Sequence, residues 1–171
     1  DIESTVLIYV SEWDARLFHY PNGIELSTLT TQLARQPLFA GIKHTNRLEQ
    51  VFIKQELIDK GLTDGLVFDT DNYLTETSFA NIFVCIDGQW TTPDLTYAGV
   101  AGTKRALLLE QADKSTSVNI QQGFIHKTAV DKIEAAIVCN ALIDFVPVKS
   151  INGRFLDQAQ AWQFVQGLLH A

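Results

Sequence analysis

The sequence contains no methionine and only two cysteines, and none of its apolar stretches is long. The best candidate for a membrane span, residues 135–143, is interrupted by Asn140 and is shorter than the roughly 18 residues that a span requires, so we expect no membrane partner. Cys85 and Cys139 lie inside apolar stretches, which is typical of reduced, buried thiols and predicts a cytoplasmic location. The chain opens at Asp1, and because no signal peptide explains that start, we expect the chain to begin inside a longer protein.

Basic residues are scarce as well. Lysine and arginine total 13 and aspartate and glutamate total 20, which gives a net charge of −7. Because the basic residues form no cluster either, nucleic acid is not an expected partner. The 171 residues, 46% hydrophobic and 19% charged, are enough for one domain with a real core, or for one large and one partial domain.

Several common catalytic motifs are missing. No Gly-x-Ser-x-Gly, Walker-type or Gly-x-Gly-x-x-Gly sequence occurs, and this disfavours serine hydrolysis and the usual phosphate-binding loops. The four histidines are scattered and pair with no cysteine or carboxylate at the spacing of metal ligands, so no metal site is expected.

The residue patterns predict a single compact α+β domain with mostly short hairpin connections. One helix has Leu48, Val51, Phe52 and Ile58 at helical spacing and ends at Gly61, and the last helix has Ala161, Phe164, Val165 and Leu168 on one face. The other predicted helices are 104–113 and 127–133. The predicted strands begin at residues 5–10 and 24–26, and continue at 66–68, 73–77, 79–86, 89–92, 117–121, 135–139 and 145–148.

Three local features carry candidate chemistry. Lys43 follows apolar residues 40–42, and such shielding lowers the pKa of a lysine and makes it a nucleophile or base, although a solvated lysine at a helix entrance is the commoner case for such a local sequence. Glu76 precedes a buried strand and needs a cation if it is desolvated, although an exposed position at a strand end fits the pattern too.

The third feature is the glycine-bearing segment 99–105, which enters a helix. Free N–H groups at a helix start bind anions, and Lys104 and Arg105 add positive charge, although a glycine at a helix entrance is also ordinary turn chemistry. A nucleophilic lysine, a carboxylate for a pyridinium nitrogen and a helix start for a phosphate are together what pyridoxal 5′-phosphate (PLP) requires.

Four segments resemble the class IV aminotransferase family, which comprises the fold-type IV PLP enzymes. The specific one is residues 40–50 (AGIKHTNRLEQ), which is similar to the lysine segment of the lyase members. Residues 75–83, 98–105 and 139–142 match in the same order and spacing. The resemblance implies an α+β fold with a mixed, barrel-like sheet and flanking helices, that of the large C-terminal domain of D-amino acid aminotransferase-like enzymes.

The resemblance also implies roles for individual residues. Lys43 is the catalytic lysine that binds PLP covalently, and Glu76 pairs with the pyridine nitrogen. The helix start at Thr103 and Lys104 binds the phosphate through backbone N–H groups, and Asn140 stands where relatives use a side chain on that phosphate. The remaining implied cofactor contact is Arg47, at a position that is often tyrosine in aminotransferases. Asn81 is expected to give structural support, and Cys139 to pack.

The chain departs from the family at its beginning, because the small N-terminal domain, which supplies an arginine to the phosphate, is missing. We therefore expect residues 1–10 to be the junction strand after that domain and residues 11–171 to be the large PLP-binding domain. Thr103 and Lys104 replace a commoner Ile-Thr pair, which backbone donors tolerate.

The resemblance implies a homodimeric lyase with a small-molecule substrate, which converts 4-amino-4-deoxychorismate to 4-aminobenzoate and pyruvate in folate biosynthesis. One alternative is a branched-chain or D-amino acid aminotransferase of the same family. The alternative from another class is a catalytically incompetent fragment that lacks the N-terminal domain.

Overall fold

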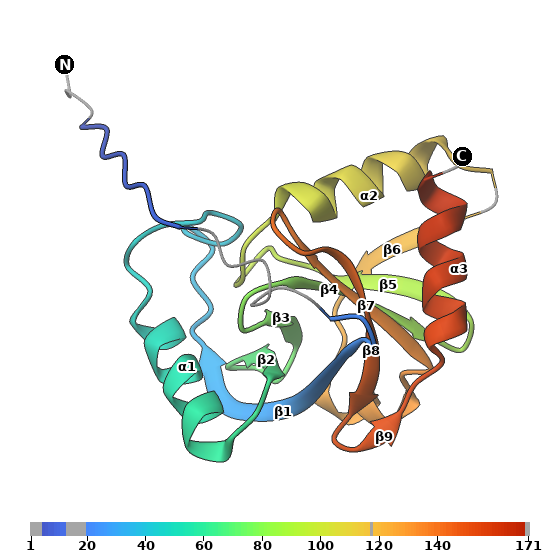
Figure 1. The fold of residues 1–171 in the computed structure, drawn as a ribbon, viewed down its shortest axis with the longest axis horizontal. Coiled ribbons are helices and arrows are strands. Elements are labelled where there is room, and N and C mark those ends of the chain that lie inside the picture. Colours follow the sequence, from blue (N-terminus) through green and yellow to red (C-terminus); the bar gives the residue numbers. More distant parts are fainter. Residues whose placement is uncertain (1–4, 13–19, 117, 170–171) are drawn as a thin grey trace.

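The computed structural model describes residues 5–12, 20–116 and 118–169, and within them nine strands form one mixed sheet that curls into a half-barrel (Figure 1). The strand order is β3-β2-β1-β8-β7-β4-β5-β6, and β9 pairs with β8. The strands are β1 (Ile24–Leu33), β2 (Asp64–Asp69), β3 (Leu74–Thr77), β4 (Asn81–Ile86), β5 (Gln89–Pro93), β6 (Ile120–Gly123), β7 (Ala135–Asn140), β8 (Asp144–Ile151) and β9 (Arg154–Phe155). The helices are α1 (Leu48–Lys60), α2 (Thr103–Lys114), the 3-10 helix η2 (Lys127–Lys132) and α3 (Gln158–Leu169).

Hairpins join β2 to β3, β4 to β5, β7 to β8 and β8 to β9, which agrees with the general prediction of mostly short hairpin connections. The pairs β1–β2 and β5–β6 are parallel instead, at the two places where the sequence predicts a helix between the strands. Parallel neighbours need a crossover, and α1 and α2 supply the two crossovers. Both helices therefore begin in loops that leave the sheet, and the candidate site is built from these loops.

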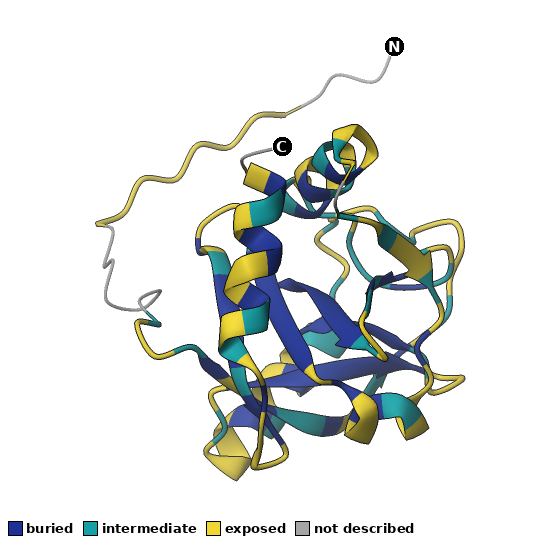
Figure 2. Ribbon diagram, turned by 90° about the vertical axis from the view of Figure 1, so that its right-hand side faces the viewer, coloured by how far each residue is buried: buried dark blue, intermediate teal, exposed yellow. Residues whose placement is uncertain are grey.

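The core is formed by the apolar strands and by α3. The side chains of β4 and β7 are almost entirely buried, which explains their continuous apolar sequences. The face of α3 predicted from sequence is buried, and Figure 2 shows its buried stripe against the sheet and its exposed stripe outward. Phe164 of α3 stacks on Trp90 with ring centroids 3.8 Å apart.

Helix α1 forms where its pattern predicts and ends at Gly61, whose φ of 62° is the left-handed helix cap. Its buried face differs from the prediction. Ile53 and Leu57 are buried, whereas Leu48, Val51, Phe52 and Ile58 are exposed. The helix carries two apolar stripes, and only one of them can face β1, so the spacing of the four exposed residues predicted the helix but not its packing.

The predicted strand at residues 5–10 is wrong in the structure. Residues 5–12 have no regular secondary structure, and all five apolar side chains from Val6 to Val10 are exposed. In Figure 1 this segment runs outward from the sheet. A β-prone sequence forms a strand only when a neighbouring strand accepts its hydrogen bonds, and within the described residues none lies beside it. The start predicted for another strand, Ser117, lies outside the described residues, and β6 begins at Ile120.

Candidate functional site

A cavity of about 630 Å³ lies at the end of the sheet where β3 and β7 end and β4 begins. The crossover loops before α1 and α2 complete its walls. Five of the six site residues predicted from sequence line it: Lys43, Arg47, Glu76, Thr103 and Asn140. The other residues of its lining are Gln50, Ser78, Phe79, Ala80, Asn81, Val100, Ala101, Gly102, Ala141 and Leu142.

Lys43 reaches this cavity from a loop that is attached to the loop before α2. The N–H of Gly41 donates to the carbonyl of Gly99 (3.0 Å), and the N–H of Ala101 donates to the carbonyl of Gly41 (3.0 Å). Of the two readings of Lys43, the structure has the solvated lysine at a helix entrance and not the apolar shielding, because Lys43 is exposed and Ile42 is 55% exposed. Apolar neighbours in sequence shield a side chain only when the fold turns them toward it, and here the loop turns Ile42 outward.

Glu76 is buried at the base of the cavity, which excludes the reading as an exposed strand-end residue. Its Oε2 accepts a hydrogen bond from the N–H of Val100 (2.9 Å), and its Oε1 accepts one from Gln50 (3.2 Å) and lies 3.4 Å from Nη2 of Arg47. Burial raises the pKa of Glu76, while the Val100 hydrogen bond and the charges of Arg47 and Lys43 oppose that rise.

Helix α2 begins at this cavity without a side-chain cap, so its first amides are open to a ligand. Gly102 is the N-cap residue, and the first amide bonded to a carbonyl of the helix start is that of Ala106, which donates to Gly102 (3.0 Å). The N–H groups of Thr103, Lys104 and Arg105 precede that bond and have no intrahelical acceptor. Together with the helix dipole, they form an anion-binding geometry.

The positive side chains expected beside that helix start point elsewhere. Lys104, predicted as a site residue, pairs with Asp144 and lies over the ring of Phe145, 5.1 Å from its centroid, so its backbone N–H is what remains for an anion. Arg105 is buried and donates to Thr92 and to the carbonyl of Pro93. Consecutive residues of a helix project in different directions, so adjacency in sequence did not bring these charges into the cavity.

The Asn140 side chain is committed to the backbone around it. Its Nδ2 donates to the carbonyl of Phe79 (3.0 Å), and its Oδ1 accepts from the N–H groups of Leu142 (2.7 Å) and Ile143 (3.0 Å). Asn140 thus holds the turn after β7 against the loop between β3 and β4 at the rim of the cavity. Asn81, expected to give structural support, bonds to the loop before α2.

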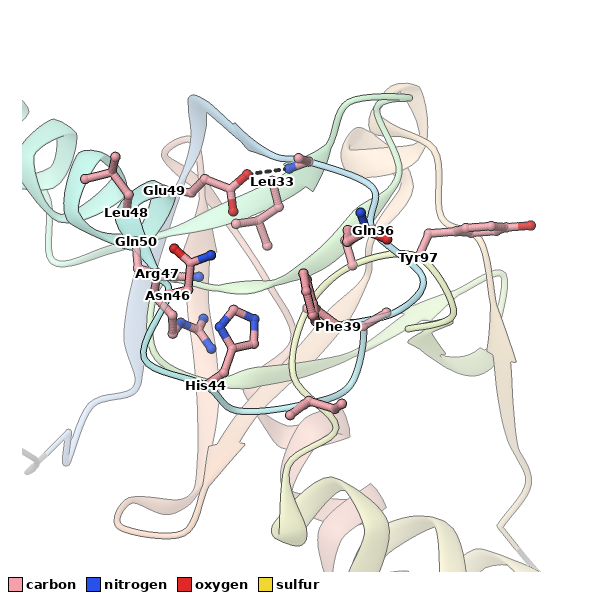
Figure 3. Close-up of a pocket in the computed structure, with 15 residues that line it drawn as sticks. Leu33, Gln36, Phe39, His44, Asn46, Arg47, Leu48, Glu49, Gln50 and Tyr97 are labelled. Atoms are coloured by element: carbon pink, nitrogen blue, oxygen red, sulfur yellow. Dashed lines mark hydrogen bonds between the residues drawn. The ribbon is translucent and has the colours of Figure 1, made fainter. Parts of the chain in front are cut away.

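Sequence reasoning did not single out Gln50, which holds Glu76 from the first turn of α1. Gln50 and Arg47 also line a second, smaller cavity of about 330 Å³ under the loop that leads to Lys43 (Figure 3). His44 and Phe39 face each other there with ring centroids 5.6 Å apart, and Glu49 accepts a hydrogen bond from the N–H of Ala34. The only sequence signal for Gln50 is its place three residues after Arg47, on the same helical face.

Among the residues that the structure describes, no three histidine, cysteine, aspartate or glutamate side chains come together in a way that would hold a metal ion. None of the described helices combines the length and apolar character needed to cross a membrane.

The chain matches the model of the family described as amino-transferase class IV over residues 1–151. It is 35% identical to an aminodeoxychorismate lyase from Vibrio harveyi over 130 residues, which are 76% of this chain and 48% of the relative. It is 26% identical to a branched-chain-amino-acid aminotransferase-like protein from Arabidopsis thaliana over 166 residues, which are 96% of this chain and 30% of the relative.

The crystal structure of 4-amino-4-deoxychorismate lyase from Pseudomonas aeruginosa superposes with a TM-score of 0.79 at 32% identity. The match covers 92% of this chain and 57% of that structure, and it confirms the predicted fold class. The chain therefore spans about half the length of the lyases that it matches. Since the family model covers most of its length, and its strands and helices superpose on those of a lyase in that family, this chain belongs to the class IV aminotransferases.

Proposed function

We propose that this chain is the cofactor-binding part of a PLP-dependent lyase that converts 4-amino-4-deoxychorismate to 4-aminobenzoate and pyruvate, a step toward folate. The observation that carries the proposal is the cavity itself, where Lys43, the buried Glu76 and the uncapped start of α2 meet. Identity of 35% to one aminodeoxychorismate lyase and 32% to another supports this reaction.

The residues of the cavity fit PLP. An amine, a buried carboxylate and a helix start with three free N–H groups match the aldehyde, the ring nitrogen and the phosphate of this cofactor. Lys43 would bind it covalently, Glu76 would face the ring nitrogen, and the amides of Thr103 and Lys104 would hold the phosphate. Asn140 would lie at the phosphate end of the cofactor, and Arg47 would contact the cofactor from another wall of the cavity. When bound, PLP withdraws electrons from the carbon that carries the substrate amine.

Each side chain then has a defined task. The Nζ amine of Lys43, once free, removes the proton from the amine-bearing carbon of the substrate. The bond to the enolpyruvyl oxygen then breaks, the substrate ring becomes aromatic, and the departing group takes up a proton and leaves as pyruvate. The ionised Glu76 carboxylate would accept a hydrogen bond from the protonated ring nitrogen and stabilise that proton, and the positive charge would in turn oppose the rise that burial causes in the pKa of Glu76. Gln50 and Arg47 fix the Glu76 carboxylate in place.

An aminotransferase reaction is the second candidate, because the similarity to the Arabidopsis branched-chain-amino-acid aminotransferase-like protein extends over 96% of this chain. The two reactions differ in their requirement for an amino acceptor. A lyase releases pyruvate from 4-amino-4-deoxychorismate alone, whereas an aminotransferase transfers the amine only when a 2-oxo acid is present.

The proposal includes a homodimer and a cytoplasmic location. The outward apolar stripe of α1, formed by Leu48, Val51, Phe52 and Ile58, offers a surface for a second subunit. Cys85 and Cys139 are both buried and free, which suits a reducing compartment. A small N-terminal domain before residues 11–171 completes the proposed enzyme, with residues 1–10 as the junction.

The test measures cofactor binding and turnover separately. We expect the protein mixed with PLP to gain the visible absorbance of a lysine-bound cofactor and to release pyruvate without an amino acceptor. Lys43→Ala should abolish both, and Lys54→Ala, an exposed lysine on α1, should change neither. Visible absorbance that persists in Lys43→Ala contradicts the assignment of Lys43. Cofactor binding without turnover by the wild-type chain supports the alternative of an incompetent fragment.

A further inference from the structure

The Asn81 side chain connects the first residue of β4 to the loop that precedes α2. Its Nδ2 donates to the carbonyl of Val100 (2.7 Å), and its Oδ1 accepts from the N–H of Gly102 (3.1 Å). Asn81 is 5% exposed and both bonds are partly buried, so their loss leaves polar groups with limited access to water. One amide group therefore determines where the loop lies immediately before the helix start.

Gly102 permits this contact by having no side chain. A Cβ at position 102 would collide with Oδ1 of Asn81, so the amide approaches the helix start as closely as a backbone allows. The N–H of Gly102 is also consumed by Asn81. An anion at this end of α2 is therefore left with the following amides, those of Thr103, Lys104 and Arg105.

The same loop is held by Glu76 of β3, the strand that precedes β4 in the chain. The N–H of Val100 donates to Oε2 of Glu76, while the carbonyl of Val100 accepts from Asn81. Residues 76 and 81, which lie on either side of the connection from β3 to β4, thus hold one short loop at three points.

We infer that Asn81 is a positioning residue that sets the helix start of α2 at a defined distance from Glu76. The inference rests on the proposed function, in which the helix start binds the phosphate of PLP and Glu76 faces its ring nitrogen. A cofactor bound at both ends requires the two anchors to be held rigidly relative to each other. Asn81 provides that link without being an anion ligand itself, since both ends of its amide are engaged with the backbone.

The test compares the affinities for PLP and for pyridoxal, which has no phosphate. Asn81→Ala should weaken PLP binding roughly tenfold, as expected for the loss of buried hydrogen bonds, and leave pyridoxal binding nearly unchanged. Asn81→Asp keeps the acceptor for Gly102 but loses the donor to Val100 and adds a negative charge, so it should weaken PLP binding further and do so most at low salt. Absorbance titrations of each protein give the dissociation constants.

Asn152 offers a matched control. Its Oδ1 accepts from the N–H of Thr28 and its Nδ2 donates to the hydroxyl of the same residue, so it also joins two segments by two bonds, although exposed ones, and it lies outside the cavity lining. Asn152→Ala should lower the thermal unfolding temperature and leave the ratio of the two affinities as in the wild type. If Asn81→Ala does the same, the inference is wrong and Asn81 serves stability alone.

Gly102→Ala tests the same contact with Asn81 in place, and a double variant then checks that the two residues act through it. Gly102→Ala should weaken PLP binding because its Cβ meets the Asn81 amide. In the Asn81→Ala background that amide is absent, so the Gly102 substitution should cost much less than it does alone. Equal losses in the two backgrounds would overturn the inference. If wild-type protein binds PLP no better than pyridoxal, the proposed phosphate site has failed instead.

Discussion

Glu76 combines burial with a charge that the surroundings only partly stabilise. Three groups approach its carboxylate, namely the N–H of Val100, the amide of Gln50 and the guanidinium of Arg47, yet burial still raises its pKa. In the protein without cofactor, ionising this carboxyl opposes folding. Such a cost at a functional residue is tolerated when the same buried charge is what binds the ligand.

Glu76→Gln should therefore separate stability from activity. The pKa of Glu76 is higher in the folded than in the unfolded state, so its contribution to stability falls as the pH rises from about 4.3, the unfolded value, through the higher folded value. Glutamine does not ionise. The unfolding temperature of cofactor-free Glu76→Gln, relative to that of the wild type, should rise with pH. Turnover by the variant should be about a hundredfold lower than that of the wild type. A variant with full turnover would refute the role assigned to Glu76.

At the scale of elements, one glutamate of α1 fastens the helix to β1. Oε1 of Glu56 accepts from the N–H and hydroxyl of Thr30 (2.8 Å each), and Oε2 accepts from the N–H of Thr31 (2.8 Å). These residues lie where the pairing of β1 with β2 shifts register. A register shift leaves strand amides without a partner strand, and the carboxylate satisfies them.

Glu56→Gln should destabilise the fold by about 2 kcal/mol at neutral pH, because a charged acceptor of several hydrogen bonds is lost. Burial opposes the charge, but the hydrogen bonds from Lys60, Thr30 and Thr31 hold the pKa of Glu56 well below its usual range. Its stabilisation is therefore full above the unfolded pKa of about 4.3 and is lost as the pH falls further.

Urea unfolding at neutral pH and near pH 3 measures the free energy of unfolding of the wild type and of Glu56→Gln. The difference between the two proteins should be smaller at the lower pH. Glu110→Gln is the control, because Glu110 also pairs with a lysine four residues later but is exposed, and it should change stability little. An equal effect of the two substitutions would contradict the fastening role of Glu56.

For the whole molecule, the half-barrel depends on α3 to cover one face of the sheet. The Phe164 ring contacts the rings of Trp90 in β5 and Phe83 in β4, and Leu168 and Val165 continue the buried stripe. Helix α3 thereby packs against β4, and β4 begins at Asn81 in the lining of the candidate site.

Phe164→Ala should lower the free energy of unfolding by about 3–5 kcal/mol, the usual cost of removing a buried phenyl ring from a packed core. Trp162→Ala on the same helix removes a side chain that is 47% exposed, and it should cost far less. Both are measured by urea unfolding of the cofactor-free protein. Similar losses would show that α3 does not cover the core through Phe164.

The sequence by itself determined most of the residues that line the candidate site. The run around Lys43, the position of Glu76 before a buried strand and the glycines before α2 are local patterns, and all lead to one cavity. Periodicity and turn residues also predicted nearly every strand and helix, because secondary structure depends largely on residues that are close in the sequence.

Only the tertiary structure decided which way side chains point. It turned Lys104 and Arg105 out of the cavity, exposed the stripe of α1 that the spacing had marked, and brought Gln50 to Glu76. It also left residues 5–12 without strand partners. These outcomes depend on contacts between residues far apart in the chain, and local propensity contains no information about which of two apolar faces, or which of two charged neighbours, the rest of the fold will meet.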